Sequence, residues 1–493
     1  MSERGKWMAL IAALLGWLFD GLEMGLFPLT ARAALTDLGI ASDQLARWQG
    51  IITAFFLVGA ATGGVLFGWL GDRIGRVKSM MLSVLVYALF SGLCGLATSA
   101  VQIGVLRFIA ALGMGGEWSL GVALINEIWP GRSRAFLAGL IGAAANVGYL
   151  VIALVGSVIM GNILGANAWL LDLGIPSEWA HYLVNVDNKG WRLITLFGML
   201  PAFLTLFIRL FVPESERWLH ERNQGATSYW ATVDLIAVLI GALAGCGIIG
   251  LWAYDLSLVI RVPLTLLGLV VVTGGYLYPV MRYLRRAEVV EGTAKGQGTL
   301  GLMVLAACLS GVALLGTWGT VQQAPPWSGS LTDAPDTASS QVQVWSALGA
   351  VLGTILAALV ADVLGRRLTY SLLCLGSLLI VPTLFLGSEQ FNVFFLATVF
   401  IAGAITAAFY GWLPLYLPEL FPTRVRATGQ GFGFNFGRVI AAIGVLQLGN
   451  LRQLLSPYGF HDAHVYSLLA GIYLIGLVII WLAPETKGRP LPE

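Results

Sequence analysis

The chain has 493 residues, of which 57% are hydrophobic and only 11% are charged. No soluble domain of this length needs so much apolar surface, so the composition predicts a protein embedded in a lipid bilayer. The net charge of +2 comes from basic residues dispersed at the ends of apolar runs, and we expect no nucleic acid partner. The four cysteines lie in apolar stretches without CxxC spacing, which favours buried thiols over disulfides or metal ligands. We expect no metal and no cofactor.

Fourteen apolar stretches are each long enough to cross a bilayer. In chain order they lie near residues 7–34, 47–70, 79–98, 101–126, 135–160, 191–212, 232–252, 262–281, 299–323, 342–361, 369–387, 393–417, 427–448 and 465–483. An even number of spans places both termini on one side, and most of the 28 Lys and Arg residues fall at span ends on that side. Because cytoplasmic loops carry the excess of Lys and Arg, we expect cytoplasmic termini and a location in the plasma membrane. Residues 161–190 and 324–341 are predicted to be outer loops, and residues 282–298 a basic inner linker.

An internal repeat divides the chain into two halves. The segment "GAATGGVLFGWLGDRIGR" (59–76) matches "GAVLGTILAALVADVLGR" (349–366), and "NEIWPGRSRAFLAG" (126–139) matches "PELFPTRVRATGQG" (418–431). The two matches have nearly the same offset along the chain, which chance does not readily produce. We therefore predict an all-α polytopic membrane protein with two six-span bundles, residues 1–218 and 299–493. Residues 219–298 are predicted to join them through an extra transmembrane hairpin at about 232–281.

The first span contains two acids within the apolar stretch "GWLFDGLEMGLF" (16–27). Asp20 and Glu23 are three residues apart, which puts both on one face of a helix. An ionised carboxylate is costly this deep in a membrane, and two neighbouring acids repel each other, so one of them is expected to hold a proton. A carboxyl group that gains and loses a proton as water access switches can couple proton flow to transport. The alternative is a structural hydrogen bond to a neighbouring span.

Two arginines also lie within apolar runs, where a guanidinium group needs an anion. The anion beside Arg107 and Arg438 is either one of the two acids or a substrate carboxylate, which Arg binds with two hydrogen bonds. Polar and aromatic residues in or near spans that are expected to face the centre are further candidate substrate contacts: Gln49, Asn146, Trp318, Gln322, Gln323, Tyr410, Trp412 and Asn435.

Several motifs resemble those of the major facilitator superfamily. "GWLGDRIGRVK" (68–78) is similar to its signature loop between spans two and three, and "RFIAALGMGGEW" (107–118) to its fourth-span motif. "VPESERWL" (212–219) and "PETKGRPL" (484–491) resemble the ends of the two halves in sugar porters, and "PELFPTRVRATGQGFGFNFGR" (418–438) resembles the inner loop of the sugar-porter and organic-acid branches. "FDGLE" resembles the DGxD motif of proton symporters for aromatic acids and sialic acid, with Glu23 where Asp is usual. The two extra spans resemble the sialate–proton symporters, which lack an equivalent of Arg438.

The resemblance implies the major facilitator fold and a cytoplasmic gate. In such a gate, charges at inner span ends bridge adjacent spans when the transporter faces outward and separate when it faces inward. The implied gate residues are Gly68, Asp72, Arg73, Gly75, Arg76, Glu117, Glu127, Arg132, Arg134, Asp362, Gly365, Arg366, Glu419, Arg424 and Arg426. The alternative is that the positive charges only orient the chain in the membrane.

The preferred function is secondary active transport by alternating access, in which protons drive symport of a small anionic metabolite such as sialic acid or another organic acid. A sugar–proton symporter is the first alternative. A polytopic membrane enzyme that uses Asp20 and Glu23 as an acid pair is less favoured, because an enzyme needs no symmetric halves. The expected partners are the small-molecule substrate, protons and the lipid bilayer, and the protein is expected to be a monomer.

Overall fold

The computed structural model describes residues 3–42, 44–129, 133–254, 256–291, 298–335 and 338–492. These residues form helices and no strand, with one isolated bridge between Thr332 and Gln390. Fourteen helical stretches of the described residues are long and apolar enough to cross a membrane. The predicted number of spans and the all-α class are confirmed.

The helices of the first half are α1 (Glu3–Asp37), α2 (Leu45–Ile74), α3 (Arg76–Leu93), α4 (Ala100–Ile128), α5 (Ser133–Gly161), α6 (Ile163–Asp172), α7 (Ser177–Leu183), α8 (Trp191–Leu196) and α9 (Ala202–Phe211). The link between the halves contains α10 (Glu216–Asn223) and a hairpin of α11 (Leu235–Ala253) and α12 (Leu258–Glu291). The second half contains α13 (Thr299–Trp318), α14 (Ala324–Ser328), α15 (Ala338–Leu364), α16 (Arg366–Leu386), α17 (Val393–Ala407), α18 (Phe409–Tyr416), α19 (Arg426–Asn435), α20 (Gly437–Leu455), α21 (Asp462–Leu469) and α22 (Ile472–Ile479).

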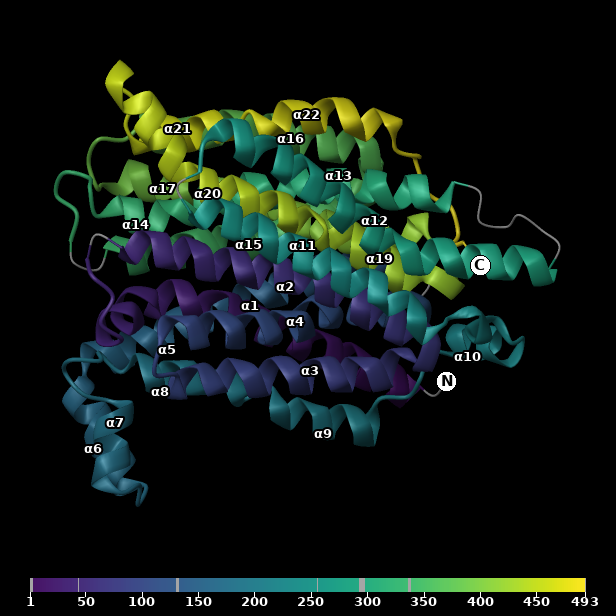
Figure 1. Cartoon of the computed structure of the whole chain (residues 1–493), viewed down its shortest axis with the longest axis horizontal. Helices are drawn as coiled ribbons and strands as arrows, with labels where there is room; N and C mark the ends of the chain where they lie inside the picture. The colour runs from purple at the N-terminus through teal and green to yellow at the C-terminus, as the bar shows by residue number, and fades with distance from the viewer. Residues whose placement is uncertain are drawn as a thin grey trace.

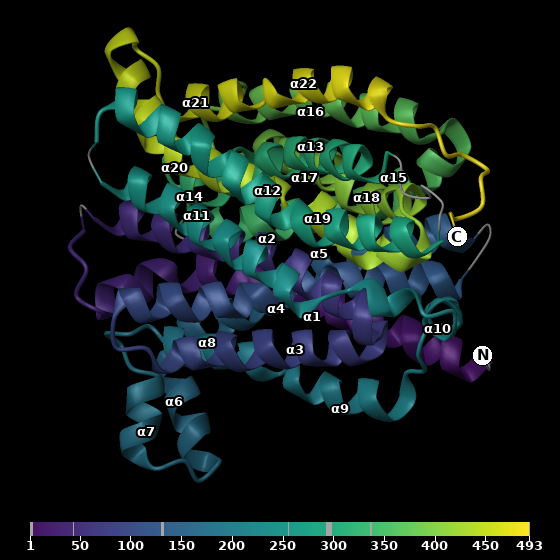
Figure 2. The same cartoon turned by 45° about the vertical axis from the view of Figure 1, so that its right-hand side comes forward.

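Both ends of the described chain lie at the same end of the helix bundle (Figures 1 and 2). We call this end the terminal end and the opposite end, where α6 and α7 lie, the distal end. The repeat-related residues Asp72 and Asp362 both lie at the terminal end, beside Arg76 and Arg366. Two halves related by an axis along the membrane normal require this placement.

Glycines let the helices of each half pack closely. A Cβ atom at Gly63 of α2 would overlap the carbonyl oxygen of Leu112 in α4. At the repeat counterpart Gly353 of α15, a Cβ atom would overlap the carbonyl oxygen of Ala404 in α17. Small residues at such crossings let two helix backbones approach each other in a membrane. The repeat is therefore present in the packing as well as in the sequence.

The hairpin of α11 and α12 lies along the seam, by which we mean the interface between the two halves. It packs against α2 and also contacts α20. The hydroxyl group of Tyr276 in α12 is 2.7 Å from Thr62 Oγ1 in α2. The Tyr276 ring lies edge-on to that of Phe436 in the second half, with 6.5 Å between the ring centres. One residue of the hairpin thus touches both halves.

Three connecting segments contain more helix than the sequence predicted. Residues 161–190 are not a plain outer loop, because α6 and α7 place Leu170, Ala180 and Leu183 in a small apolar cluster against the first half. Asn162 caps α6 by accepting a hydrogen bond from the Gly165 backbone N–H at 3.0 Å. Helix α12 continues through much of the predicted linker 282–298, where no Gly or Pro stops it before Glu291. Helix α14 occupies part of the predicted loop 324–341.

Candidate functional site

The two acids of α1 are both buried, but they face different partners. Ser91 of α3 donates a hydrogen bond to Glu23 Oε2. Arg107 of α4 donates one from Nη1 to Glu23 Oε1 at 3.1 Å. The Arg107 guanidinium group also lies 4.9 Å from the ring centre of Phe27 and 4.6 Å from that of Phe56. Glu23 and Arg107 therefore form a closed ion pair inside the first half.

Asp20 has a different environment: its Oδ1 atom has no hydrogen-bond partner among the described residues. Glu117 of α4 and Arg438 of α20 act on its carboxyl group electrostatically. Glu117 lies against α1 one turn before Asp20, where a Cβ atom at Gly16 would overlap Glu117 Oε1. The glycine leaves room for this second carboxyl group. Sequence reasoning grouped Glu117 with the gate, but the structure places it at the middle of the bundle, ten residues before Glu127 on α4.

Arg438 reaches the seam from the second half. Its side chain is buried, and its Nη1 atom has no hydrogen-bond partner among the described residues. Its guanidinium carbon lies 5.2 Å from the ring centre of Phe434. Phe434 in turn stacks on Trp118 of α4, with 3.9 Å between ring centres. Stacked aromatic rings from both halves thus cover one side of the Arg438 guanidinium group.

The other predicted substrate contacts do not all lie in one place. Tyr410 lies edge-on to Phe434 at 6.4 Å, near Arg438. Two amides are hydrogen-bonded to backbone carbonyl groups: Asn146 to Gly142 at 3.0 Å, and Asn435 across the seam to Gly115 at 3.0 Å.

The remaining predicted contacts lie toward the two ends of the bundle. Gln322 Oε1 accepts a hydrogen bond from Tyr149 of α5 at 3.3 Å, and Gln323 donates to the carbonyl oxygen of Trp318 at the end of α13. Gln49 is half-buried in the first turns of α2 at the distal end. Trp412 is fully buried at the terminal end and donates to the carbonyl oxygen of Arg366 at 3.0 Å, so it is a packing residue there and not a central one.

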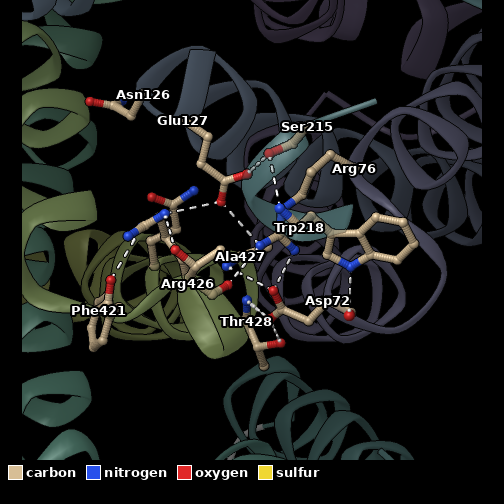
Figure 3. Close-up of polar contacts among 12 residues, drawn as sticks. Asp72, Arg76, Asn126, Glu127, Ser215, Trp218, Phe421, Arg426, Ala427 and Thr428 are labelled. Carbon is tan, nitrogen blue, oxygen red and sulfur yellow. Dashed lines mark hydrogen bonds and ion pairs between the residues drawn. The ribbon is translucent and has the colours of Figure 1, made fainter. Parts of the chain in front are cut away.

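A buried charge cluster joins the two halves at the terminal end (Figure 3). Asp72 of α2 contacts Arg76, and it accepts hydrogen bonds from the Thr428 backbone N–H at 2.8 Å and hydroxyl at 2.6 Å. Glu127 of α4 accepts hydrogen bonds from Arg76 and from Arg426 of α19, each at 3.1 Å. Thr428 and Arg426 belong to the second half. These contacts hold the first half against the second at this end.

A second cluster crosses the other side of the seam. Glu419 accepts a hydrogen bond from Arg134 of α5, and two more from Arg366 of α16 at 3.0 and 2.8 Å. Thr486, near the end of the chain, donates to the same carboxylate at 2.5 Å. Glu127 and Glu419, which the repeat aligns, thus play equivalent parts on the two sides of the seam.

The remaining predicted gate residues have smaller parts. Asp362 is 46% exposed and lies 3.7 Å from Arg366. Arg73 donates to Thr232 at 2.5 Å, and Arg424 pairs with Glu221 at 3.8 Å, so both arginines contact the link between the halves. A Cβ atom at Gly68 would lie 2.8 Å from the backbone of Thr428, which makes this glycine part of the seam. Arg132 lies outside the described residues.

The helices next to the two clusters are capped by two acids to which the sequence assigned no role. Glu214 accepts hydrogen bonds from the backbone N–H groups of Arg76 and Val77, where α3 begins. Glu485 does the same for Arg366 and Arg367 at the start of α16. The signal was present in the sequence, because these are the acids of "VPESERWL" and "PETKGRPL".

The glycine before each of these helices explains the paired motifs. Gly75 and Gly365 have φ values of 118° and 98°, which a residue with a side chain rarely adopts. A Cβ atom at Gly75 would also overlap the Glu214 carboxylate. Burial raises the pKa of Glu214. Burial also acts to raise the pKa of Glu485, but the N–H groups that donate to it hold this pKa below its ordinary value.

The sequence profile of the "Sugar (and other) transporter" family matches residues 8–232 and 334–493. The chain belongs to this family. It is 27% identical over 477 residues to the E. coli inner membrane metabolite transport protein YgcS, a match that covers 96% of this chain and 90% of that one. It is 24% identical over 451 residues to the cis,cis-muconate transport protein of Acinetobacter baylyi, covering 90% and 87%. The E. coli major facilitator superfamily proton:xylose symporter XylE has the same fold, with a TM-score of 0.71 at 18% identity over 100% of this chain and 98% of that chain.

The family and the fold agree with the expectation from the motifs. The protein is a major facilitator transporter of metabolites or organic acids, a multi-pass membrane protein and not an enzyme. Its two six-helix bundles carry an additional hairpin, as predicted.

Proposed function

We propose that the protein is a proton-coupled symporter of a small anionic metabolite, with an organic acid such as sialic acid as the leading class. The observation that carries this proposal is Arg438, a buried cation at the seam whose Nη1 atom is unpartnered among the described residues. Such a group favours a carboxylate, which a guanidinium group holds with two parallel hydrogen bonds. The relative named for cis,cis-muconate transport supports an organic acid.

The coupled proton is carried by an acid of α1, Asp20 or Glu23. Both are buried among apolar helices, where a carboxyl group without a matching cation favours its neutral form. The corresponding first helix of the second half, α13, contains no acid. A structural pair required by the fold itself would be expected in both halves, so its presence in one half supports a functional role.

Alternating access is proposed to occur by separation of the clusters at the terminal end. This end is the cytoplasmic side of the plasma membrane if the excess of Lys and Arg there follows the usual rule for inner loops. The contacts of Glu127 with Arg426 and of Glu419 with Arg134 then close the cytoplasmic side. They release when the halves rock apart, because each contact joins residues of different halves.

Counterflow into proteoliposomes tests the substrate class. Proteoliposomes that contain the purified protein would be preloaded with excess unlabelled compound and then given labelled N-acetylneuraminate, cis,cis-muconate or D-xylose. Protein-free liposomes are the control. Exchange of an acid, together with its accumulation under an imposed inward proton gradient, is the expected result. Exchange of xylose and of neither acid would overturn the proposal in favour of the sugar alternative, which the family match and the XylE fold keep open.

A further inference from the structure

We propose that a phospholipid binds between the hairpin and the first half, with one acyl chain in an apolar cavity and its phosphate group on Arg47. The lipid comes from the distal leaflet, by which we mean the half of the bilayer at the distal end. The cavity has a volume of about 550 Å³ and lies among α2, α4 and α11. It shares no residue with the charge clusters or with Arg438, so the inference goes beyond the proposed symport and does not depend on the substrate.

The cavity exists because the three helices separate toward the distal end. A Cβ atom at Gly245 of α11 would lie 2.8 Å from Val58 of α2, so these two helices are in close contact there. Five residues farther along α11, the Cβ position of Gly250 has no neighbour within 4 Å. On α4, the Cβ position of Gly104 has one such neighbour, Ile52 of α2 at 3.8 Å. Close packing therefore gives way to a wedge-shaped space beside the distal end.

The depth and lining of this space fit an acyl chain. Helix α2 lines it from Arg47 to Phe55, which is ~12 Å of helix. One leaflet of the bilayer core is about 15 Å thick. The rings of Phe55 and Phe108 meet edge-on at its inner end, with 6.5 Å between their centres. Its charged and amide side chains, Arg47 and Gln44, are at the mouth, so the interior suits a hydrocarbon chain and not an anionic substrate.

The cavity opens toward the bilayer. All its lining residues belong to the first half or to α11 and its end. Two of them, Val101 and Val105 of α4, are 60% and 55% exposed, which in a membrane means contact with lipid. The same two valines also line a groove of about 360 Å³ on the other side, bordered by Leu93 and Leu96. A lipid with two acyl chains can therefore straddle this ridge of α4, with one chain on each side.

Arg47 supplies a cation where the lipid head group would lie. Its side chain is exposed in the first turn of α2, and it donates one hydrogen bond to the carbonyl oxygen of Ala253 at the end of α11. A guanidinium group has five N–H donors, so further donors are available. Arginine holds a phosphate with paired, charge-assisted hydrogen bonds. Among the described residues, which leave out Asp43 and Asp255, no carboxylate forms an ion pair with Arg47.

Native mass spectrometry of the full chain in detergent, after addition of phosphatidylglycerol, tests the cavity by counting the lipid that stays bound. Gly250→Leu places a side chain in the cavity where no atom is close enough to clash, and it should abolish retention. Gly274→Leu in α12 is the matched control, because Gly274 is exposed, does not line the cavity and also has open space at its Cβ position. It should retain lipid like the unmodified protein. Equal retention in both variants would overturn the proposal.

The phosphate contact is tested with the same measurement. Arg47→Gln should lower retention of phosphatidylglycerol about tenfold, from the loss of charge-assisted hydrogen bonds, and Arg47→Lys should lower it less because the charge remains. Diacylglycerol with the same acyl chains lacks the phosphate and should not be retained by the unmodified protein. Retention of diacylglycerol equal to that of phosphatidylglycerol, or retention in Arg47→Gln equal to that of the unmodified protein, would overturn the contact with Arg47.

Two further measurements keep the test independent of folding defects. Added phosphatidylglycerol should raise the melting temperature of the unmodified protein and of Gly274→Leu, because a ligand of the folded state stabilises it, and should leave that of Gly250→Leu unchanged. Phosphatidylglycerol with a photoreactive group at the chain end should label the peptides that contain Phe55, Phe108 or Cys246 at the inner end of the cavity. Labelling confined to other segments, or an equal rise in melting temperature in all three proteins, would overturn the proposal.

Discussion

The substitution Asp72→Asn is expected to destabilise the state in which the two halves are in contact at the terminal end by about 2 kcal/mol. The reason is the loss of charge-assisted hydrogen bonds at a helix N-terminus. Asp72 accepts hydrogen bonds from Thr428 at 2.8 and 2.6 Å and from the Ala427 N–H at 3.4 Å. These donors are the first residues of α19 in the second half, so the bonds exist only while the halves are together. Asparagine keeps one oxygen acceptor but loses the charge.

The repeat supplies a matched control in Asp362→Asn. Asp362 occupies the equivalent position in the second half, but it is 46% exposed and lies 3.7 Å from Arg366 of its own half. An exposed ion pair of this kind contributes little to stability. None of the hydrogen bonds and ion pairs of the described residues joins Asp362 to the first half. The same chemical change is therefore expected to leave the seam intact.

Single-molecule energy transfer measures the difference directly. Dyes at Leu219→Cys and Val363→Cys, in a variant whose four native cysteines are replaced, would report the distance between the halves at the terminal end. A loss of about 2 kcal/mol corresponds to a shift of about 30-fold toward the separated state in Asp72→Asn. Asp362→Asn should match the parent. An Asp72→Asn distribution equal to that of the parent, or equal shifts in both variants, would refute the reasoning.

Three further changes test other parts of the structure. Gly75→Ala should lower the free energy of unfolding in detergent by roughly 1–3 kcal/mol, because Gly75 has a positive φ. Gly365→Ala should lower it by less, because its Cβ atom would lie 3.0 Å from Glu485 and would not overlap the carboxylate. Equal losses in the two variants would contradict this account. Glu485→Gln should lower the melting temperature at neutral pH. Because the pKa of Glu485 is lowered in the folded protein, its stabilisation is complete above about pH 4.3 and is lost as the pH falls through the lowered value, so the melting curves of variant and parent should converge in acid. Arg438→Gln should raise the Kd of an acid substrate more than about tenfold, or about 1.4 kcal/mol, and an unchanged Kd in equilibrium binding would exclude a direct contact.

The sequence alone determined the membrane architecture, because a bilayer permits few alternatives. Apolar stretches long enough to cross it must become helices, because the bilayer core has no water to hydrogen-bond the backbone N–H and C=O groups. The repeat then placed Asp72 and Asp362 at one end of the molecule, and its aligned motifs grouped the charges around Glu127 and Glu419. The folded protein brings these two acids to arginines of both halves.

Only the tertiary structure decided which side chain each central charge contacts. Helical spacing predicts that Asp20 and Glu23 share a face, but it cannot say which neighbouring helix each acid meets, because these contacts join residues far apart in the chain. In the folded protein Glu23 pairs with Arg107, whereas Asp20 Oδ1 has no hydrogen-bond partner among the described residues. The depth of Glu117 could be read from the sequence, because it lies ten residues before Glu127 in the same span. Its neighbour could not: the approach of Glu117 to Gly16 follows from how α4 packs against α1, which is a property of the assembled helices.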